Sequence, residues 1–212
     1  IEGPTAIDEP RWDVRDPHRF SYSLWVDGLP QIMTADLVPR GDGFDVRATL
    51  AHDFAGELPP EWNATFVWRR WEGSPSSDGR YDAFMVEDQD FITRGLITYD
   101  WQTGALLGQY TVPHGEQNEP DNVSISPLGT YVFAMFEYCE RGTLGTYEAP
   151  CGAMVYTRDL AQGRGVVRIA GHGDLALDAN GREVYVYQET DTDQIAMVDL
   201  ETGQVTPLLD LD

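Results

Sequence analysis

The stretch Ile97-Thr-Tyr-Asp-Trp-Gln-Thr-Gly104, which continues to His114, decides the architecture because its pattern returns along the chain. The pattern is an apolar strand, an aspartate, a glycine turn and a second strand that ends on a histidine. The other copies run from Ile32 through Asp36 to His52, from Met154 through Asp159 to His172, and from Ile195 through Asp199 to Gly203 and the last residues. A repeat of roughly 40–50 residues indicates one supersecondary unit that is stacked several times.

A second, independent pattern interleaves with the first. Turn signals followed by alternating apolar residues occur at Ser77–Tyr81, Ser126–Tyr131 and Asp178–Val184. Each turn lies upstream of one copy of the first pattern, so a repeat reads as strand, turn, strand, loop, strand, turn, strand. Four strands per copy predict an all-β fold, a β-propeller of four-stranded antiparallel blades. We expect at least half of the chain to be antiparallel strand.

The repeats resemble the blades of WD-repeat proteins. Ile97–Gly104 with its continuation to His114 is similar to the third and outer strands of such a blade, and Asn122–Val132 to its inner strand and turn. Gly171-His172 matches the Gly-His dipeptide of the family, and Asp193 matches its structural aspartate. The looser YVTN-type propellers of secreted bacterial proteins fit equally well. The chain departs from the WD pattern in having its tryptophan in one of four copies and Gly-His in one of three.

The repeats divide the chain into a lead-in and four blades. We expect an irregular lead-in at residues 1–19 and blades at 20–52, 62–114, 122–172 and 174–212, the first without an inner strand. Because propellers close with about 4–8 blades, we expect these blades to be part of a larger ring. Further blades would come from sequence absent from this chain or from a second chain. The first source is preferred, because closure by two identical halves requires matching geometry at both seams.

The charge of the chain excludes some partners. All 14 basic residues are arginine, against 36 Asp and Glu, which gives a formal net charge of -22. Nucleic acid and anionic membrane surfaces both require a cationic patch, so neither is expected as a partner. No apolar run reaches the length of a transmembrane helix, so no membrane insertion is expected. Such a lysine-free, acidic composition is typical of a halophilic or marine secreted protein, and equally of a GC-rich genome.

The only two cysteines, Cys139 and Cys151, flank a polar segment that contains two glycines and a proline. Their spacing predicts a disulfide that closes the loop between the second and third strands of the third blade. A disulfide implies an oxidising compartment, so we expect a secreted, periplasmic or cell-surface protein. Two buried free thiols are the alternative.

The resemblance implies a face on which the functional loops meet. In WD-repeat propellers, the loops leaving the outer strand and those joining the second and third strands share one face around the channel. Function on a rigid scaffold usually lies in such loops. The candidate ligand-binding residues that this placement gives are His52, Asp53, His114, Glu119, Asp121, His172, Asp174, Glu189, Asp191 and Asp193.

The histidines of this set allow two interpretations. By resemblance, each hydrogen-bonds the aspartate of its own blade and is architectural. Alternatively, His52, His114 and His172 converge at the channel mouth and bind a divalent metal, as in propeller lyases acting on uronate sugars. The acidic run Glu189–Asp193 is either a solvated loop or a Ca²⁺ site, although it lacks the glycine and distal glutamate of an EF-hand.

No nucleophile motif stands out in the sequence, since it holds neither GxSxG nor HExxH. The favoured function is therefore a secreted, noncatalytic β-propeller scaffold whose loop face binds a protein, glycan or small ligand. One alternative is a propeller hydrolase or polysaccharide lyase with a His/carboxylate site at the channel mouth, with Ca²⁺ or another divalent metal. Another is the propeller subunit of a redox dehydrogenase.

Overall fold

The structure is a computed structural model of the 212-residue chain. It describes residues 10–26, 29–68, 74–90, 92–112, 120, 122–136, 152–160, 167–170, 172–188 and 194–210. In this part of the chain, the strands form four antiparallel sheets of four strands each, and each sheet takes its strands in sequence order. The strands span half of the 212 residues, as the repeats predict.

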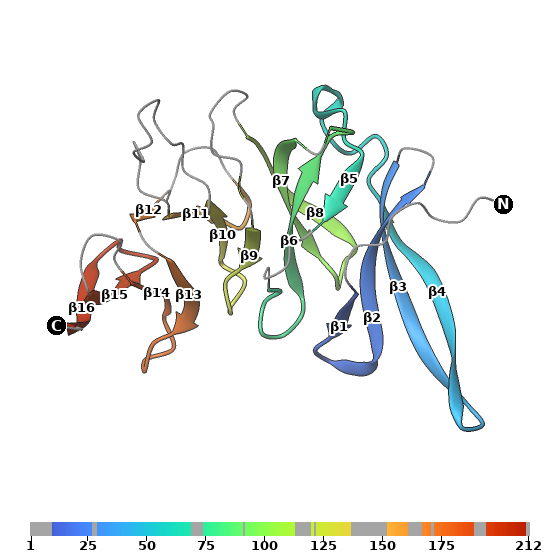
Figure 1. The fold of residues 1–212 in the computed structure, drawn as a ribbon, viewed down its shortest axis with the longest axis horizontal. Coiled ribbons are helices and arrows are strands. Elements are labelled where there is room, and N and C mark those ends of the chain that lie inside the picture. Colours follow the sequence, from blue (N-terminus) through green and yellow to red (C-terminus); the bar gives the residue numbers. More distant parts are fainter. Residues whose placement is uncertain are drawn as a thin grey trace.

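Figure 1 shows the four sheets side by side in chain order, with the first and the fourth sheet at opposite ends of the row. The first two sheets comprise β1 (Arg11–Asp13), β2 (Asp16–Val26), β3 (Leu29–Arg40) and β4 (Gly43–Asp53), and β5 (Phe66–Trp68), β6 (Tyr81–Glu87), β7 (Thr93–Asp100) and β8 (Ala105–Thr111). The last two comprise β9 (Asn122–Ile125), β10 (Tyr131–Phe136), β11 (Gly152–Thr157) and β12 (Val167–Ala170), and β13 (His172–Leu177), β14 (Glu183–Gln188), β15 (Gln194–Asp199) and β16 (Val205–Asp210).

The expected lead-in is wrong for the residues after position 10. The first sheet has an inner strand, β1, whose Arg11 and Trp12 lie opposite Ser21 and Phe20 of β2. β2 itself begins at Asp16. A three-residue strand is too short to show the period-2 alternation by which strands are recognised, so the sequence pattern missed it.

Another correction concerns the boundary between the third and fourth sheets. The repeat pattern predicts that His172 ends the outer strand of the third blade. In the structure that outer strand is β12, which ends at Ala170, and His172 is the first residue of β13, the inner strand of the next sheet.

Alternating residues of the strands fill the spaces between neighbouring sheets. Between the first and second sheets, Ile32 packs with Trp62, Phe84 and Tyr99. The other face of β6 presents Ala83 and Met85 to Val132 and Tyr156 of the third sheet; Phe133 and Val155 then face Tyr185, Tyr187 and Val198 of the fourth. Each interior sheet is therefore apolar on both faces, unlike a sheet with one solvated face.

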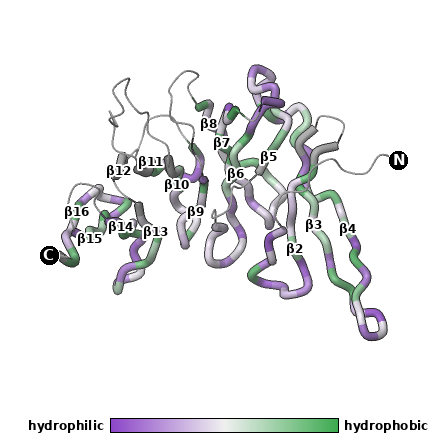
Figure 2. Tube along the Cα trace, viewed as in Figure 1, coloured by the Kyte–Doolittle hydropathy of each residue, from purple (hydrophilic) through white to green (hydrophobic). Residues whose placement is uncertain are grey.

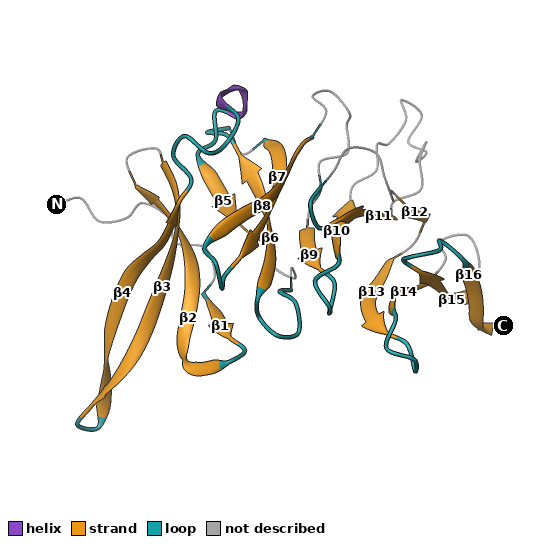
Figure 3. Cartoon of the chain, turned by 180° about the vertical axis from the view of Figure 1, so that it is seen from behind, coloured by secondary structure: helices purple, strands orange, loops and turns teal. Residues whose placement is uncertain are grey.

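The strands meet solvent at two ends, which Figure 3 shows above and below the sheets. We call one the turn end: it carries the turns at 76–80, 126–130 and 178–182. Contacts place these turns on the same side, because the Ser77 N–H donates to the Pro127 carbonyl and the Leu128 N–H to the Glu183 carboxylate. We call the other the loop end. The segments that connect strands there are 27–28, 54–65, 88–92, 112–121, 137–151, 171 and 189–193.

The helical content of the described residues is one 3-10 turn, Pro60–Trp62, drawn in purple in Figure 3. No helix in the described ranges has the length and apolar character needed to cross a membrane.

Candidate functional site

At the turn end, buried aspartates hold the turns between the third and fourth strands of the second and fourth sheets. Asp100 accepts the backbone N–H of Gln102 at 2.8 Å and the Arg80 guanidinium at 2.9 Å. Burial raises the pKa of Asp100, but the Arg80 guanidinium and the backbone N–H groups outweigh it and hold that pKa below its usual value. This carboxylate therefore stays ionised as part of the framework.

Asp199 repeats this arrangement in the fourth sheet. It accepts the N–H groups of Glu201 at 3.0 Å and Thr202 at 2.9 Å, and the Arg182 guanidinium at 2.9 Å. The Thr202 N–H does most to lower the pKa of Asp199. The matching Gly-Arg pairs, Gly79-Arg80 and Gly181-Arg182, are the sequence signal for these ion pairs.

In the second, third and fourth sheets, the turns between the first and second strands share another hydrogen-bonding arrangement. The side-chain oxygen of the first turn residue accepts backbone N–H groups near the end of the turn: Ser76 from Tyr81, Ser126 from Thr130 and Tyr131, and Asp178 from Asn180 and Arg182. Glycine follows with φ of +67°, +74° and +76° at Gly79, Gly129 and Gly181, a backbone conformation that costs other residues about 1–2 kcal/mol. The predicted glycine turns are confirmed.

The Asp178 carboxylate is the most strongly perturbed of these groups. Its pKa falls to about 2, chiefly because it accepts the backbone N–H of Arg182, and also because the Arg182 guanidinium lies 2.7 Å away. A carboxylate so firmly ionised and hydrogen-bonded is a capping group for a turn, not a proton donor at neutral pH.

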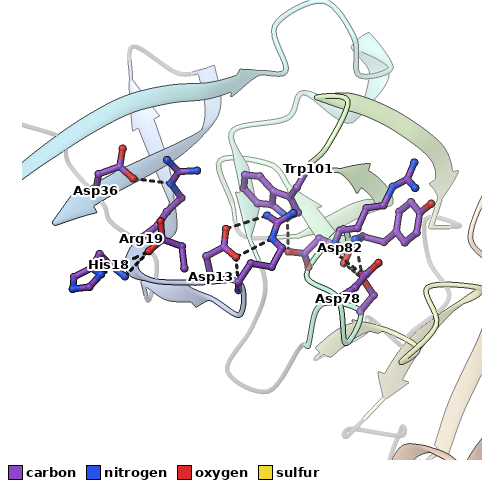
Figure 4. Close-up of polar contacts among 12 residues, drawn as sticks. Asp13, His18, Arg19, Asp36, Asp78, Asp82 and Trp101 are labelled. Atoms are coloured by element: carbon purple, nitrogen blue, oxygen red, sulfur yellow. Dashed lines mark hydrogen bonds and ion pairs between the residues drawn. The ribbon is translucent and has the colours of Figure 1, made fainter. Parts of the chain in front are cut away.

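Polar contacts also join neighbouring parts of the chain within the first and second sheets (Figure 4). Arg19 of β2 pairs with Asp36 of β3 at 2.6 Å, and the Trp101 indole N–H donates to Asp82 at 3.0 Å. At the seam between the second and third sheets, the Tyr81 ring lies 4.1 Å from the Arg158 guanidinium. These groups hold neighbouring strands or neighbouring sheets together, so their contacts fit an architectural role.

At the loop end, His52 occupies the position of a candidate ligand. Its Nε2 lies 3.1 Å from the Glu57 carboxylate, and its ring lies between Phe54 and Tyr99, with centroids 4.5 and 5.1 Å away. Only 12% of the side chain is exposed. The resemblance implies a bond between His52 and an aspartate of its own blade, but the described polar partner of His52 is Glu57. His52 thus has an architectural contact with the segment that follows its own strand.

Asp53 and Asp174 are the other candidate residues whose side chains the structure describes. The Asp53 carboxylate accepts the Ala55 N–H at 2.9 Å and thereby starts the segment after β4. Asp174 lies exposed on β13. His172 begins the same strand, and its side chain is not among those described. The remaining candidates, His114, Glu119, Asp121, Glu189, Asp191 and Asp193, lie outside the described residues, as do Cys139 and Cys151.

Sequence analysis missed two polar contacts at the loop end. Glu57, the partner of His52, lies five residues beyond it, at no repeated spacing. Asp88 accepts the N–H groups of Asp90 and Ile92 and pairs with Arg94, which fixes the connection between β6 and β7. Within the described ranges, no group of three or more His, Cys, Asp or Glu side chains is placed to hold a metal ion.

The two ends differ in charge. The connecting segments at the loop end contain fourteen acidic residues and one arginine. Those at the turn end (14–15, 41–42, 69–80, 101–104, 126–130, 158–166, 178–182 and 200–204) contain six acidic residues and seven arginines. By sequence, the segments that connect strands at the loop end therefore carry thirteen acidic residues in excess, whereas the segments that connect strands at the turn end carry one arginine in excess.

No family model matches the chain, and no curated protein matches it closely enough to count as a relative. Solved structures match it over almost its whole length. An acylaminoacyl peptidase in complex with Z-Gly-Gly-Phe-chloromethyl ketone matches 98% of this chain and 33% of its own, with a TM-score of 0.50 and 11% identity. TolB from Acinetobacter baumannii matches 97% of this chain and 44% of its own, with a TM-score of 0.45 and 16% identity.

The β-propeller domain of Cps50 (Swd1) from Myceliophteria thermophila matches 93% of this chain and 57% of its own, with a TM-score of 0.45 and 11% identity. The chain therefore spans less than two thirds of each of these three proteins. At such identities the likeness shows the fold alone. Together with the four sheets of four strands in sequence order, it shows that this chain is an all-β protein built of β-propeller blades.

Proposed function

We propose that the chain is a noncatalytic β-propeller scaffold that binds its ligand, a protein, glycan or small molecule, through the acidic loop end. The observation that carries the proposal is the division of charged groups between the two ends. At the turn end, carboxylates and arginines neutralise one another in hydrogen-bonded turns. At the loop end, acidic residues exceed basic ones by thirteen.

This excess makes the loop end suited to a ligand with a cationic surface. Like charges gathered on one face produce a potential that attracts opposite charge and speeds association. The described histidine and aspartate of the candidate set, His52 and Asp53, are occupied by contacts within the first sheet and its following segment. Their engagement supports a rigid platform more than a reaction centre, because a catalytic base must have a free face toward its substrate.

The two cysteines fit the same proposal. They lie in segment 137–151, the longest connection at the loop end. A disulfide between them would reduce the freedom of this segment before binding, and a preorganised loop binds with a smaller entropic cost. It would also agree with a secreted, periplasmic or cell-surface location. Thiol titration of the denatured, unreduced protein is expected to find no reactive thiol; two reactive thiols would rule out the bridge.

Binding of an oligolysine peptide, used as the cationic probe, tests the location of the site. The triple variant Glu189→Gln, Asp191→Asn, Asp193→Asn removes three charges from the loop end. The matched variant Asp42→Asn, Asp159→Asn, Glu201→Gln removes three from the turn end. With a screening length of about 10 Å at 0.1 M salt, only nearby charges act strongly. We expect the first variant to weaken binding about tenfold and the second to change it less than about twofold.

Equal weakening by the two variants would show that the probe senses net charge alone, which would contradict a site at the loop end. Calorimetric titration gives both affinities under the same conditions. Thermal unfolding of each variant provides the control that the sheets remain folded.

A further inference from the structure

The hairpin formed by β3 and β4 reaches further than the hairpins of the other sheets. These strands have 12 and 11 residues, whereas β7 and β8, the matching pair of the second sheet, have 8 and 7. At about 3.3 Å per residue, the longer strands extend the hairpin by about 13 Å. Figure 1 shows it extending past the turns of the other three sheets, and Figure 2 shows that its tip is hydrophilic. Residues 39–50 are all exposed, so the tip stands free in solvent.

The tip is a two-residue turn, Gly41-Asp42, between the paired residues Arg40 and Gly43. Gly41 has a φ of +62°, and a glycine with positive φ at the first turn residue is typical of a type II′ hairpin. A methyl group at Gly41 would meet no atom within 4 Å, so the backbone there is open to an approaching partner. The tripeptide Arg40-Gly41-Asp42 therefore occupies the end of the hairpin, with an exposed charged residue on each side of the glycine.

This Arg-Gly pair differs in its setting from the other one that the structure describes. Arg-Gly occurs four times in the sequence, and an aspartate follows it only at Asp42. At Arg94-Gly95, the other described pair, the arginine binds Asp88. A methyl group on that glycine would overlap the Trp62 ring, so the pair is enclosed within the second sheet. The hairpin tip instead presents a cation, a bare backbone and an anion together to solvent.

Arg40 is held by a weak ion pair. Its Nη1 lies 3.2 Å from the Asp45 carboxylate, and the exposed fractions of the two side chains are 76% and 49%. Asp45 lies opposite Val38, two residues before Arg40, so the pair crosses the hairpin diagonally. An ion pair so exposed to water contributes little to stability. Arg40 can therefore exchange Asp45 for the carboxylate of a partner at small cost.

The chemistry of the tripeptide indicates what kind of pocket would recognise it. Mg²⁺ and similar cations are bound through few carboxylates and keep water ligands, so a cation held by one protein can take a carboxylate of another in place of water. A guanidinium forms two parallel hydrogen bonds with a carboxylate. A pocket with a divalent cation beside an acidic side chain therefore fits Asp42 and Arg40 together. The glycine between them lets the wall of the pocket approach the backbone closely.

The charge of the first sheet permits an acidic pocket to approach. Residues 10–53 contain seven aspartates, five arginines and no glutamate, so they carry only -2 of the net charge of -22. Repulsion between like charges is therefore weaker at this sheet than the net charge of the chain suggests.

We propose that Arg40-Gly41-Asp42 is a docking site for a cell-surface receptor whose pocket holds a divalent cation for the Asp42 carboxylate and an acidic side chain for the Arg40 guanidinium. The site lies at the turn end and shares no residue with the ligand site proposed at the loop end. Its biological role rests on the secreted or cell-surface location proposed above. Binding by the purified protein does not depend on location, so the thiol titration and the experiment below can fail separately.

The test is surface plasmon resonance against the immobilised ectodomain of an integrin that binds Arg-Gly-Asp peptides, with Mn²⁺ present. We expect saturable binding that is lost when EDTA removes the cation. Asp42→Glu keeps the charge but moves the carboxylate by one methylene, so it should weaken binding about a hundredfold. Arg40→Lys should weaken it about tenfold, because an ammonium cannot form the two parallel hydrogen bonds. Asp45→Asn releases Arg40 and should leave the affinity equal or higher.

Asp90→Glu is the matched control, since it adds the same methylene to an exposed aspartate of the loop end and should leave the affinity unchanged. Thermal unfolding checks that each variant remains folded. The absence of saturable binding would overturn the proposal, as would binding that persists in EDTA or an equal affinity in Asp42→Glu. Loss of binding in Asp45→Asn would also overturn it, because Asp45 and not Asp42 would then be the carboxylate that the receptor takes.

Discussion

The turn end and the loop end of the blades carry charged residues in different ways. At the turn end, Asp100 and Asp199 each accept backbone N–H groups and an arginine, so their charges are balanced locally. At the loop end, fourteen acidic residues share their connecting segments with one arginine. The difference teaches that a chain of net charge -22 can balance its structural carboxylates locally, while most of its unbalanced charge lies in the sequence of one set of connecting segments.

The largest effect is expected from crowding the turn end at Gly129. In the variant Gly129→Ala, the new methyl group would overlap the Tyr81 ring, and φ is +74°. Together, strain of about 1–2 kcal/mol and overpacking of about 1–3 kcal/mol should lower the free energy of unfolding by about 3 kcal/mol. Unfolding in urea measures this decrease in the free energy of unfolding.

Gly181→Ala is the matched control for this variant. Its φ is +76°, but a methyl group there would meet open space, so only the backbone cost of about 1–2 kcal/mol applies. Equal losses in the two variants would show that the seam between the second and third sheets does not depend on close packing at Gly129.

Removing a structural carboxylate should cost less. Asp100→Ala leaves the Gln102 N–H and the Arg80 guanidinium without their acceptor, and we expect a loss of about 2 kcal/mol in the free energy of unfolding. Asp90→Ala, an exposed aspartate at the loop end, should change it by less than about 0.5 kcal/mol. Chemical denaturation measures both losses in the free energy of unfolding. Equal losses would show that carboxylates at the two ends do not differ in their contribution to stability.

His52 allows the architectural interpretation to be tested at the loop end. His52→Ala removes the contact with Glu57 and the ring packed between Phe54 and Tyr99, so we expect a loss of about 1 kcal/mol in stability. Thermal unfolding with and without added Zn²⁺ makes the measurement specific. A Zn²⁺-dependent rise in Tm that is abolished by the substitution would instead assign His52 to a metal site.

The smallest effect concerns pH. The folded-state pKa of Asp178 is about 2, below its unfolded value of about 3.9. Its contribution to stability is therefore fully present above about pH 4 and is lost as the pH falls toward 2. Arg182→Gln removes one cause of the low pKa, so the stability difference from the unaltered protein should shrink across this window. A difference that stays constant from pH 6 to pH 2 would contradict the assigned pairing.

The glycine turns were predictable from the sequence because their cause is local. Gly79, Gly129 and Gly181 adopt positive φ, which favours glycine wherever the turn occurs. The strand order followed from the same repeats, since consecutive strands joined by short turns pair with each other.

Other features depend on partners distant in sequence and escaped prediction. The repeat pattern places Asp159 of the third sheet at the position of Asp100 in the second sheet. In the structure that position belongs to Thr157, because Thr157 lies opposite Tyr131 of β10, just as Asp100 lies opposite Tyr81 of β6. Strand register is set by contacts across the sheet, so a repeat of residue types does not determine it. The His52–Glu57 contact escaped for a related reason, because the resemblance assigns His52 a different partner.

The most direct test of the division between the two ends is to locate the bound oligolysine probe. Hydrogen–deuterium exchange, read by mass spectrometry with and without the probe, reports each connecting segment separately. We predict slower exchange in segments 112–121, 137–151 and 189–193, and unchanged exchange in the turns 101–104, 126–130 and 178–182. Protection confined to the turns, or spread equally over both ends, would contradict the account.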